Sequence, residues 1–364
     1  MLESLATPFL YVDLDRMTSN IERMAVAARE LGVRVRPHAK THKVPEIARL
    51  QLAAGATGIT LAKVSEAEIF ADGGIEDVFL AYQVVAPAAL ERLVRLAGRA
   101  KLRCAVDSRA GAELLSRAAK DGGIELEVML EIDLGIGRTG ARAGAPACEL
   151  AQRIADLPSL RLVGVYGFRG FAASADGPAA REAWGRAEGE ALVSAAEDLR
   201  SIGLPITEVS AGSTPTALPA GSVPGVTEIR PGQYLFGCAN VVAQGAMQAE
   251  QVALFAQATV ISRPADDRAV VDAGSKTLSS DASWQPGRGF GYLASDPATL
   301  VMGLWEEHGV LRLGERSNGL RVGDRVSIVP NHVCSAINLH ERLIGVRDDR
   351  IEVTWKIAAR GRIE

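Results

Sequence analysis

Short apolar runs alternate with stretches of helical spacing over the first two-thirds of the chain. Eight of these runs are predicted to be strands, and several are apolar almost throughout, as strands buried on both faces should be. They are Val33–Pro37, Gly58–Ala62, Asp77–Gln83, Leu102–Val106, Leu126–Ile132, Leu162–Phe168, Ile206–Ser210 and Glu228–Leu235. Eight β/α units in roughly 200 residues predict a (β/α)8 barrel of the TIM type. An open, doubly wound sheet is the alternative, because the pattern alone does not show closure.

The pattern changes after about Asn240. Strand-like runs are now separated by Gly, Pro, Asp and Asn, and no clear amphipathic helix lies between them, which predicts an antiparallel β domain. The runs are Gln251–Val260, Arg268–Asp272, Leu300–Leu304, Arg325–Val329 and Ile351–Trp355. We therefore expect a barrel domain at residues 14–238 and a β domain at 239–364. The apolar run Phe9–Val12 makes residues 1–13 a candidate to pair with the second domain.

Composition narrows the function classes. Across 364 residues, 40 Lys and Arg face 44 Asp and Glu, for a formal net charge of −4. That balance provides no broad cationic surface, so nucleic acid is not an expected partner. No apolar run approaches the ~20 residues that a bilayer span needs, so no membrane association is expected.

The first residues and the cysteines bear on the cellular compartment. The first fifteen residues include Glu3 and Asp13 and lack a basic segment, so they do not resemble a signal peptide. The four cysteines are far apart and form no C-x-x-C pair. A disulfide framework is not expected, and a reducing cytoplasm fits.

Candidate chemistry lies at the predicted strand ends, where barrel enzymes place their catalytic residues. The first barrel strand runs into Arg36–Lys43, where Lys40 follows an apolar strand into a loop. A partly desolvated lysine at such a point has a lowered pKa and acts as a nucleophilic amine. A single loop lysine is more often solvated, so Lys40 needs support from its context.

The later strand ends provide that context. Small and hydroxyl residues in Ser210–Thr216 allow close approach to an anion, although they also make ordinary turns. Thr227–Tyr234 covers the eighth strand, and phosphate sites formed by the last two strand ends are common in this fold. Arg138 is held among glycines in Glu131–Gly140, suited to reach inward or to form a surface ion pair. A lysine on one strand end and a phosphate cradle on the last two are what a pyridoxal phosphate barrel needs.

These segments resemble the fold-type III pyridoxal phosphate enzymes, within the D-serine dehydratase and D-threonine aldolase family, distantly similar to alanine racemases. Further shared segments are Asp272–Lys276, Glu306–Gly309 and Pro330–Cys334. Together the segments run across nearly the whole chain in the family's order. The resemblance implies that Lys40 forms the Schiff base with pyridoxal 5′-phosphate and that Lys43 is its solvated neighbour.

The resemblance also implies the other contacts of the cofactor. Arg138 is expected near its phenolic oxygen, and Tyr166 is expected to face the cofactor or the substrate. The phosphate is expected to be held by residues of the last two strand ends, namely Ser213, Thr214, Gly232 and Gln233.

His332 and Cys334 form a candidate metal site in the β domain. In an extended segment, residues two apart leave the same face, and imidazole with thiolate suits zinc. On the residues alone, H-x-C is more often a buried histidine beside a buried cysteine. The resemblance favours the metal, because dehydratase-type relatives carry H-x-C here and several aldolases carry H-x-D, which better suits magnesium or manganese. His308, in Glu306–Gly309, belongs to another shared segment and has no assigned role.

One departure from the family bears on the reaction. Many aldolase-type relatives carry Y-x-G-H after the sixth strand, where this chain has phenylalanine at both ends of Phe168–Phe171. Phenylalanine neither moves a proton nor binds a metal-held water. A retro-aldol cleavage needs a base for the β-hydroxyl proton, so the loss of histidine favours β-elimination, unless a metal-bound hydroxide is the base.

The resulting expectation is a pyridoxal phosphate- and divalent metal-dependent lyase acting on a small D-β-hydroxy amino acid. Zinc is the favoured metal, with manganese or magnesium as alternatives. A dehydratase converting D-serine or D-threo-3-hydroxyaspartate to a 2-keto acid and ammonia is preferred over an aldolase releasing glycine and an aldehyde. A racemase and a non-catalytic pyridoxal phosphate carrier are less favoured. The family architecture implies a homodimer.

Overall fold

The computed structural model describes residues 4–170 and 177–364. Its contacts divide the chain into two compact units. The barrel unit comprises Arg23–Lys40, Pro45–Gly232 and Gly361–Glu364, and the β unit comprises Met1–Glu22, Thr41–Val44 and Gln233–Arg360. None of the described helices is both long and apolar enough to cross a membrane.

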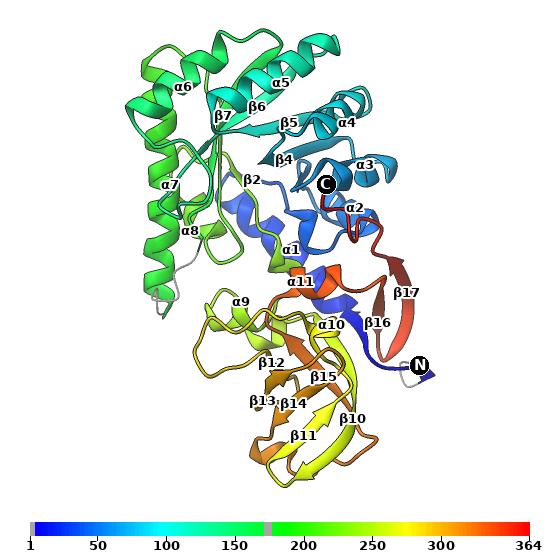
Figure 1. Ribbon diagram of the computed structural model, residues 1–364. Coiled ribbons are helices and arrows are strands. Elements are labelled where there is room, and N and C mark those ends of the chain that lie inside the picture. Colours follow the sequence, from blue (N-terminus) through cyan, green and yellow to red (C-terminus); the bar gives the residue numbers. More distant parts are fainter. Residues whose placement is uncertain (1–3, 171–176) are drawn as a thin grey trace. The chain divides into compact units, whose positions relative to one another are not determined.

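Eight parallel strands form the barrel unit (Figure 1). They are β2 (Arg34–Val35), β3 (Ile59–Leu61), β4 (Asp77–Gln83), β5 (Lys101–Val106), β6 (Leu126–Ile132), β7 (Leu160–Gly167), β8 (Glu208–Ala211) and β9 (Glu228–Ile229). Their order is β2-β9-β8-β7-β6-β5-β4-β3. The ring closes between β2 and β3, where the Thr60 amide donates to the Pro37 carbonyl at 2.8 Å and His38 bridges Thr60. The predicted TIM-type barrel is confirmed, and the open sheet is excluded.

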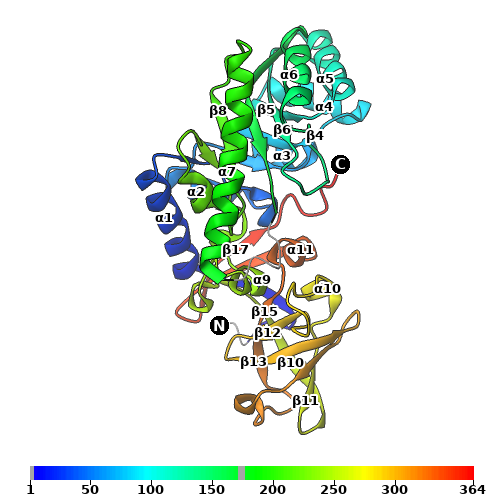
Figure 2. The same ribbon diagram turned by 90° about the vertical axis from the view of Figure 1, so that its left-hand side faces the viewer.

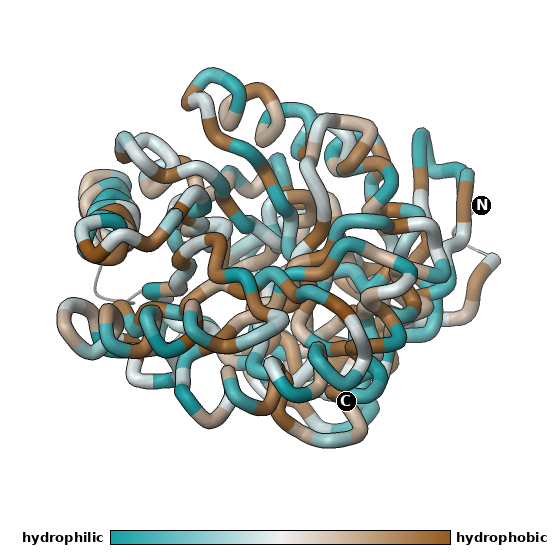
Figure 3. The backbone as a smooth tube through the Cα atoms, turned by 90° about the horizontal axis from the view of Figure 1, so that it is seen from above, coloured by the Kyte–Doolittle hydropathy of each residue, from teal (hydrophilic) through white to brown (hydrophobic). Residues whose placement is uncertain are grey.

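Helices follow the strands and cover the outside of the barrel. They are α2 (Pro45–Ala53), α3 (Val64–Asp72), α4 (Pro87–Ala97), α5 (Arg109–Asp121), α6 (Ala145–Ala155), α7 (Gly177–Ser201) and α8 (Ala217–Gly221), while α1 (Leu14–Glu30) begins in the β unit. Figure 3 shows hydrophilic and hydrophobic stretches mixed along the backbone. A long helix such as α5 buries one face, which includes Ala112, Leu115 and Ala119. Helix α7 lies alongside β7, β8 and α8 (Figure 2).

Apolar side chains fill the inside of the barrel. One cluster joins Phe79, Ala105, Met129, Val163 and Tyr166, which come from four successive strands. The phenylalanine and tyrosine rings meet edge to face with centroids 5.0 Å apart. This packing explains why the barrel strands appear as nearly continuous apolar runs in the sequence.

The β unit contains one nine-stranded sheet. Its strands are β1 (Phe9–Asp13), β10 (Leu254–Ala265), β11 (Arg268–Val271), β12 (Gly291–Leu293), β13 (Asp296–Leu304), β14 (Gly309–Arg312), β15 (Arg325–Pro330), β16 (Arg342–Arg347) and β17 (Arg350–Lys356). All neighbours pair antiparallel except β1 and β16. The long β10 pairs with β11, β15 and β1, so six strands close a small ring beyond which β1, β16 and β17 extend the sheet.

The structure differs from the sequence prediction at the end of the barrel, in short helices of the β unit, and in strands β12, β14 and β16, which were not among the predicted runs. The last barrel strand was expected to span Glu228–Leu235, but β9 ends at Ile229 and Gln233–Leu235 forms a 3-10 turn. Pro231 has no amide hydrogen to donate to a strand neighbour, which favours the break. The β unit also contains three short helices that the pattern did not reveal: α9 (Ala239–Ala243), α10 (Ser275–Leu278) and α11 (Val333–Asn338).

Candidate active site and metal site

Lys40 lies just beyond the C-terminal end of β2, in the 3-10 turn Ala39–Thr41. Its side chain is exposed, so the partial desolvation expected from the sequence is not seen. Lys43 also differs from its expected exposure, but in the opposite direction. It was expected to be solvated, but it is buried and adopts a left-handed backbone conformation with φ 57°. Of the two lysines, Lys40 is therefore the one that a small molecule can reach from solvent.

His38 brings a neutral imidazole to the same strand end. Burial, together with the charges of Lys40, Arg230 and Arg138, holds its pKa well below the usual range. The ring bonds the backbone of Thr60, while its Nδ1 is buried without a hydrogen-bond partner among the described residues. A buried unpaired nitrogen is costly, and it fits a site that a polar cofactor completes.

Glu131 connects two of the expected cofactor residues, Arg138 in the loop after β6 and Tyr166 on β7. Its Oε2 accepts a 2.8 Å hydrogen bond from the Tyr166 hydroxyl, and its Oε1 lies 3.8 Å from Nη2 of Arg138. Burial, and next the Glu131 carboxylate, raise the pKa of Tyr166, so its hydroxyl stays protonated. Arg138 is exposed and lies 5.2 Å from the centre of the Phe168 ring. The structure thus brings Arg138 and Tyr166 to a common carboxylate.

The expected phosphate residues Ser213 and Thr214 lie in the turn between β8 and α8. Gly212 enters this turn with φ +87°, and an added Cβ would lie 2.8 Å from the Ala217 Cα, so only glycine fits. The Ser213 amide donates to Thr216 Oγ1 at 3.0 Å, and the two hydroxyls lie 3.1 Å apart. A tight turn that gathers hydroxyls and amides is suited to binding an anion.

Gly232 and Gln233, the other expected phosphate residues, follow β9. Gly232 is the last residue of the long barrel segment, whereas Gln233 starts the 3-10 turn in the β unit and its Oε1 lies 3.4 Å from Cys238 Sγ. Lys40, Arg138, Tyr166, Ser213 and Gly232 follow or end parallel strands of one closed barrel. They therefore belong to the same, C-terminal rim.

The metal-site prediction requires one correction. The segment carrying His332 and Cys334 is not extended: His332 is the N-terminal cap of α11 and Cys334 is its second residue. The two side chains nevertheless meet in a hydrogen bond, because the extended backbone of the cap (φ −138°, ψ 102°) turns the imidazole towards the first helical turn. Thr41 Oγ1 lies 3.2 Å from Cys334 Sγ.

Asp281 orients the imidazole. Its Oδ2 lies 2.6 Å from His332 Nδ1 and also accepts a 2.6 Å hydrogen bond from the Ser335 hydroxyl. Asn331 donates its side-chain amide to the Asp281 carbonyl at 3.1 Å and so holds the loop in place. A carboxylate on one ring nitrogen leaves the other, Nε2, to bind a metal, as in carboxylate–histidine–metal sites.

The neighbours of His332 favour a positive charge on its ring. Burial would lower the pKa of His332, but Cys334 and Asp281 outweigh it and raise the pKa to about 9, so a metal at this ring would have to displace a proton. Among the described residues, no three His, Cys, Asp or Glu side chains converge in a metal-binding cluster. His332 and Cys334 are the two candidate donors at this place, and imidazole with a cysteine sulfur is a pair that suits zinc.

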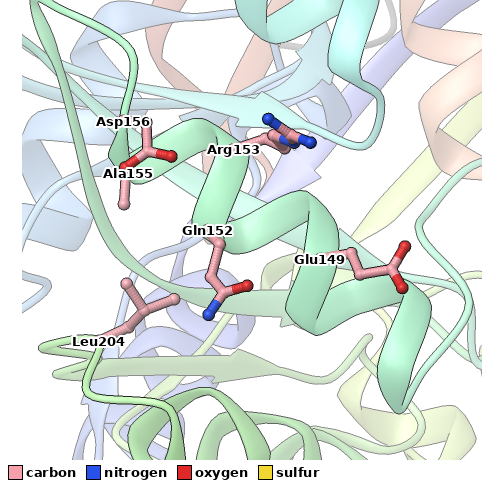
Figure 4. A pocket seen from close by; sticks show the side chains of 6 residues that line it. All are labelled: Glu149, Gln152, Arg153, Ala155, Asp156 and Leu204. Carbon is pink, nitrogen blue, oxygen red and sulfur yellow. The ribbon is translucent and has the colours of Figure 1, made fainter.

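Two other features lie outside these sites. His308 is exposed in the turn between β13 and β14. A shallow polar hollow of about 380 Å³ is formed by α6 and the segment after α7 (Figure 4). Its lining residues are Glu149, Gln152, Arg153, Ala155, Asp156 and Leu204, none of which is a predicted site residue. Phe171, one of the two departures from the aldolase pattern, lies outside the described residues.

Sequence reasoning did not single out Asp281, Glu131 or His38 individually. Asp281 lies 51 residues from His332 and belongs to no motif. The other two fall inside segments that the family resemblance covers, but only the fold shows which of their atoms are paired. Sequence reasoning also missed Glu188, a buried glutamate on α7.

Comparison with known proteins gives the same family along the whole chain. Residues 12–240 match the alanine racemase N-terminal domain, and residues 253–346 match the putative serine dehydratase domain. D-threonine aldolase from an Arthrobacter species is 35% identical, with 99% of this chain and 94% of the relative covered. D-threo-3-hydroxyaspartate dehydratase from Delftia sp. is 38% identical, with 92% of each covered.

Solved structures agree. The D-threonine aldolase of Filomicrobium marinum has a TM-score of 0.92 and 33% identity, covering 99% of this chain and 97% of the other. The Delftia dehydratase has a TM-score of 0.90 and 36% identity, covering 98% of both chains. A cysteine-to-alanine variant of that dehydratase is described as being in a metal-free form. The chain therefore belongs to the family of alanine racemase-like barrel proteins with a D-serine dehydratase domain, which includes D-threonine aldolase and D-threo-3-hydroxyaspartate dehydratase.

Proposed function

We propose that this protein is a pyridoxal phosphate- and divalent metal-dependent lyase that acts on D-β-hydroxy amino acids. The relatives named above are lyases of such substrates. The observation that carries the proposal is the pairing of His332 with both Cys334 and Asp281, a donor set and support that a racemase or a carrier would not need. The residues of the barrel rim fit the cofactor that the family implies.

Each rim residue has a definite task in the proposal. When bound, pyridoxal phosphate supplies an electron sink for the bond broken at the substrate Cα. Lys40 would hold the cofactor through its Nζ, and its amine would be the base for the Cα proton. Arg138 would hold the phenolic oxygen, and the turn with Ser213 and Thr214, together with the amides of Gly232 and Gln233, would hold the phosphate. Tyr166, whose hydroxyl donates to Glu131, would position the ring.

The β unit supplies the second component. His332 and Cys334 would bind the metal, and a divalent cation makes a hydroxyl a better leaving group by withdrawing charge from its oxygen. Zinc is favoured because one imidazole and one thiolate are its preferred donors, while manganese and magnesium prefer oxygen.

The direction of cleavage is part of the proposal. Phenylalanine replaces both proton-carrying side chains of the aldolase pattern at Phe168 and Phe171. Without them, loss of the β-hydroxyl is favoured over cleavage between Cα and Cβ, so we propose a dehydratase acting on D-serine or D-threo-3-hydroxyaspartate. Retro-aldol cleavage is the second candidate, supported by the aldolases at 33–35% identity.

Product analysis on two substrates tests the proposal. Purified protein is incubated with D-threonine and with D-threo-3-hydroxyaspartate, with and without prior EDTA treatment. The expected products are a 2-keto acid and ammonia, lost on chelation and restored by added zinc, manganese or magnesium. Glycine with an aldehyde would establish the aldolase, and inversion at Cα without cleavage would establish a racemase.

A second experiment tests the covalent anchor. Borohydride reduction followed by peptide mapping should place the pyridoxyl label on Lys40, and Lys40→Ala should lose both label and turnover. Label on a different lysine in the wild type would overturn the assignment of Lys40.

A further inference from the structure

A buried glutamate on α7 holds two loops of the barrel rim together. Glu188 has no exposed surface. Its Oε1 accepts the amide of Gly212 at 2.9 Å, and its Oε2 accepts the hydroxyl of Thr216 at 2.8 Å. The backbone amide of Arg169 is a third donor, so the carboxylate joins the loop after β7 to the turn after β8.

Two glycines bring the glutamate to this place. Gly185 and Gly189 lie four residues apart on α7. A Cβ added at Gly185 would lie 2.6 Å from Pro219 Cβ, and one added at Gly189 would lie 2.7 Å from the Ala220 carbonyl oxygen. Helix α7 therefore approaches α8 and its preceding turn closely enough for the short reach of Glu188. Burial raises the pKa of the Glu188 carboxyl, because a buried position disfavours the charged carboxylate.

The hydrogen bonds fix the directions of the hydroxyls in the turn. Thr216 has one hydroxyl proton, and it is donated to Glu188. Thr216 Oγ1 can then only accept, so it receives the amide of Ser213 and, at 3.1 Å, the Ser213 hydroxyl. A single carboxylate thus determines the conformation of Gly212–Thr216, including the residues expected to meet the phosphate.

We propose that Glu188 is a positioning residue for phosphate binding: by accepting the Gly212 amide and the Thr216 hydroxyl, it fixes the Gly212–Thr216 turn in the conformation that presents Thr214 to the phosphate of the cofactor. The inference rests on the proposed function, in which this turn binds pyridoxal phosphate. Glu188 touches the turn and not the phosphate. Its effect should therefore appear only with ligands that carry a phosphate.

The test compares two ligands that differ only in that group. Pyridoxal phosphate and pyridoxal are titrated into cofactor-stripped wild type, Glu188→Gln and Glu188→Ala, with Glu190→Gln as the matched control at an exposed position on the same helix. Both Glu188 variants should bind pyridoxal phosphate at least about tenfold more weakly, a loss of one or two hydrogen bonds from a preorganised site. Their affinity for pyridoxal should match the wild type, and Glu190→Gln should match it for both ligands.

Other results are equally informative. Equal weakening of both ligands, or no weakening of either, would overturn the positioning role. If Glu188→Ala does not fold, Thr216→Val removes the same hydroxyl link while keeping the shape of the side chain, and it must give the same selective loss. Failure of wild-type protein to bind pyridoxal phosphate at all would instead refute the proposed function.

Discussion

Replacing Asp281 with asparagine tests whether His332 is a metal ligand held by its neighbour. The substitution preserves the shape of the side chain, and the amide oxygen can still accept a hydrogen bond from Nδ1. It removes the negative charge 2.6 Å from the ring, which holds the imidazole in place and makes the opposite nitrogen a stronger donor. Metal affinity should therefore fall while the fold is retained.

The size of the effect follows from the exposure of the pair. Loss of such a supporting carboxylate usually weakens metal binding by about 10- to 100-fold. The side chains of His332 and Asp281 are 36% and 43% exposed, so water screens part of their interaction. We expect the lower end, roughly a tenfold rise in Kd, which corresponds to about 1.4 kcal/mol.

Calorimetric titration of zinc into EDTA-treated protein measures this change directly. His332→Ala should abolish binding at the same site, and Asp266→Asn, an exposed aspartate in the turn after β10, should leave it unchanged. An unchanged Kd in Asp281→Asn alongside lost binding in His332→Ala would refute the supporting role of the carboxylate. Unchanged zinc binding in His332→Ala would refute the assignment of His332 as a metal ligand.

Three further substitutions probe the barrel. Glu228→Gln should destabilise by about 3 kcal/mol in thermal unfolding, because it leaves the buried Arg36 guanidinium short of a partner 2.8 Å away. Burial would raise the pKa of Glu228, but Arg36 outweighs it and lowers the pKa, so wild-type stability is lost as pH falls through that value. The variant should lack this acid dependence, and an identical pH profile would contradict the reasoning. Gly58→Ala places a Cβ 2.1 Å from Arg36 Nη1, so it should lower the free energy of unfolding by denaturant by about 1–3 kcal/mol. Gly319→Ala adds its Cβ in open space and should change this free energy little. Equal decreases for the two variants would count against the clash at Gly58. Tyr166→Phe removes a buried hydrogen bond to a carboxylate and should cost about 1–3 kcal/mol by the same measurement, so unchanged stability would mean that the bond contributes nothing.

The barrel could be predicted because its strands are buried on both faces. A run such as Leu162–Gly167 is buried throughout, and its sequence is an uncharged, mainly apolar block. Strands β12, β14 and β16 were not predicted; β12 and β14 have only three and four residues, which carry little periodicity. Helix α11 is also short, six residues, and the sequence analysis considered only an extended conformation for its first residues.

The candidate site was predictable only where its chemistry is local in sequence. His332 and Cys334 form a pair that can be recognised two residues apart, and Lys40 stands at a strand end. Asp281 lies 51 residues from His332 and Glu188 lies 24 residues from Gly212, and only the folded backbone brings each pair together. Gly185 and Gly189 were the one available signal, since glycines four apart on a helix indicate close approach of another element.

Strand β1 has a consequence for how the protein is made. Phe9 pairs with Gln257 in β10, so the strand leaves the ribosome 248 residues before its partner does. At ~5–20 residues per second, that interval is about 12–50 s, during which the whole barrel can be translated. An unpaired apolar strand can form backbone hydrogen bonds with an exposed strand edge of another chain. Nascent chains of this protein should therefore depend on a chaperone or on rapid barrel folding to keep this segment from joining a neighbouring polypeptide.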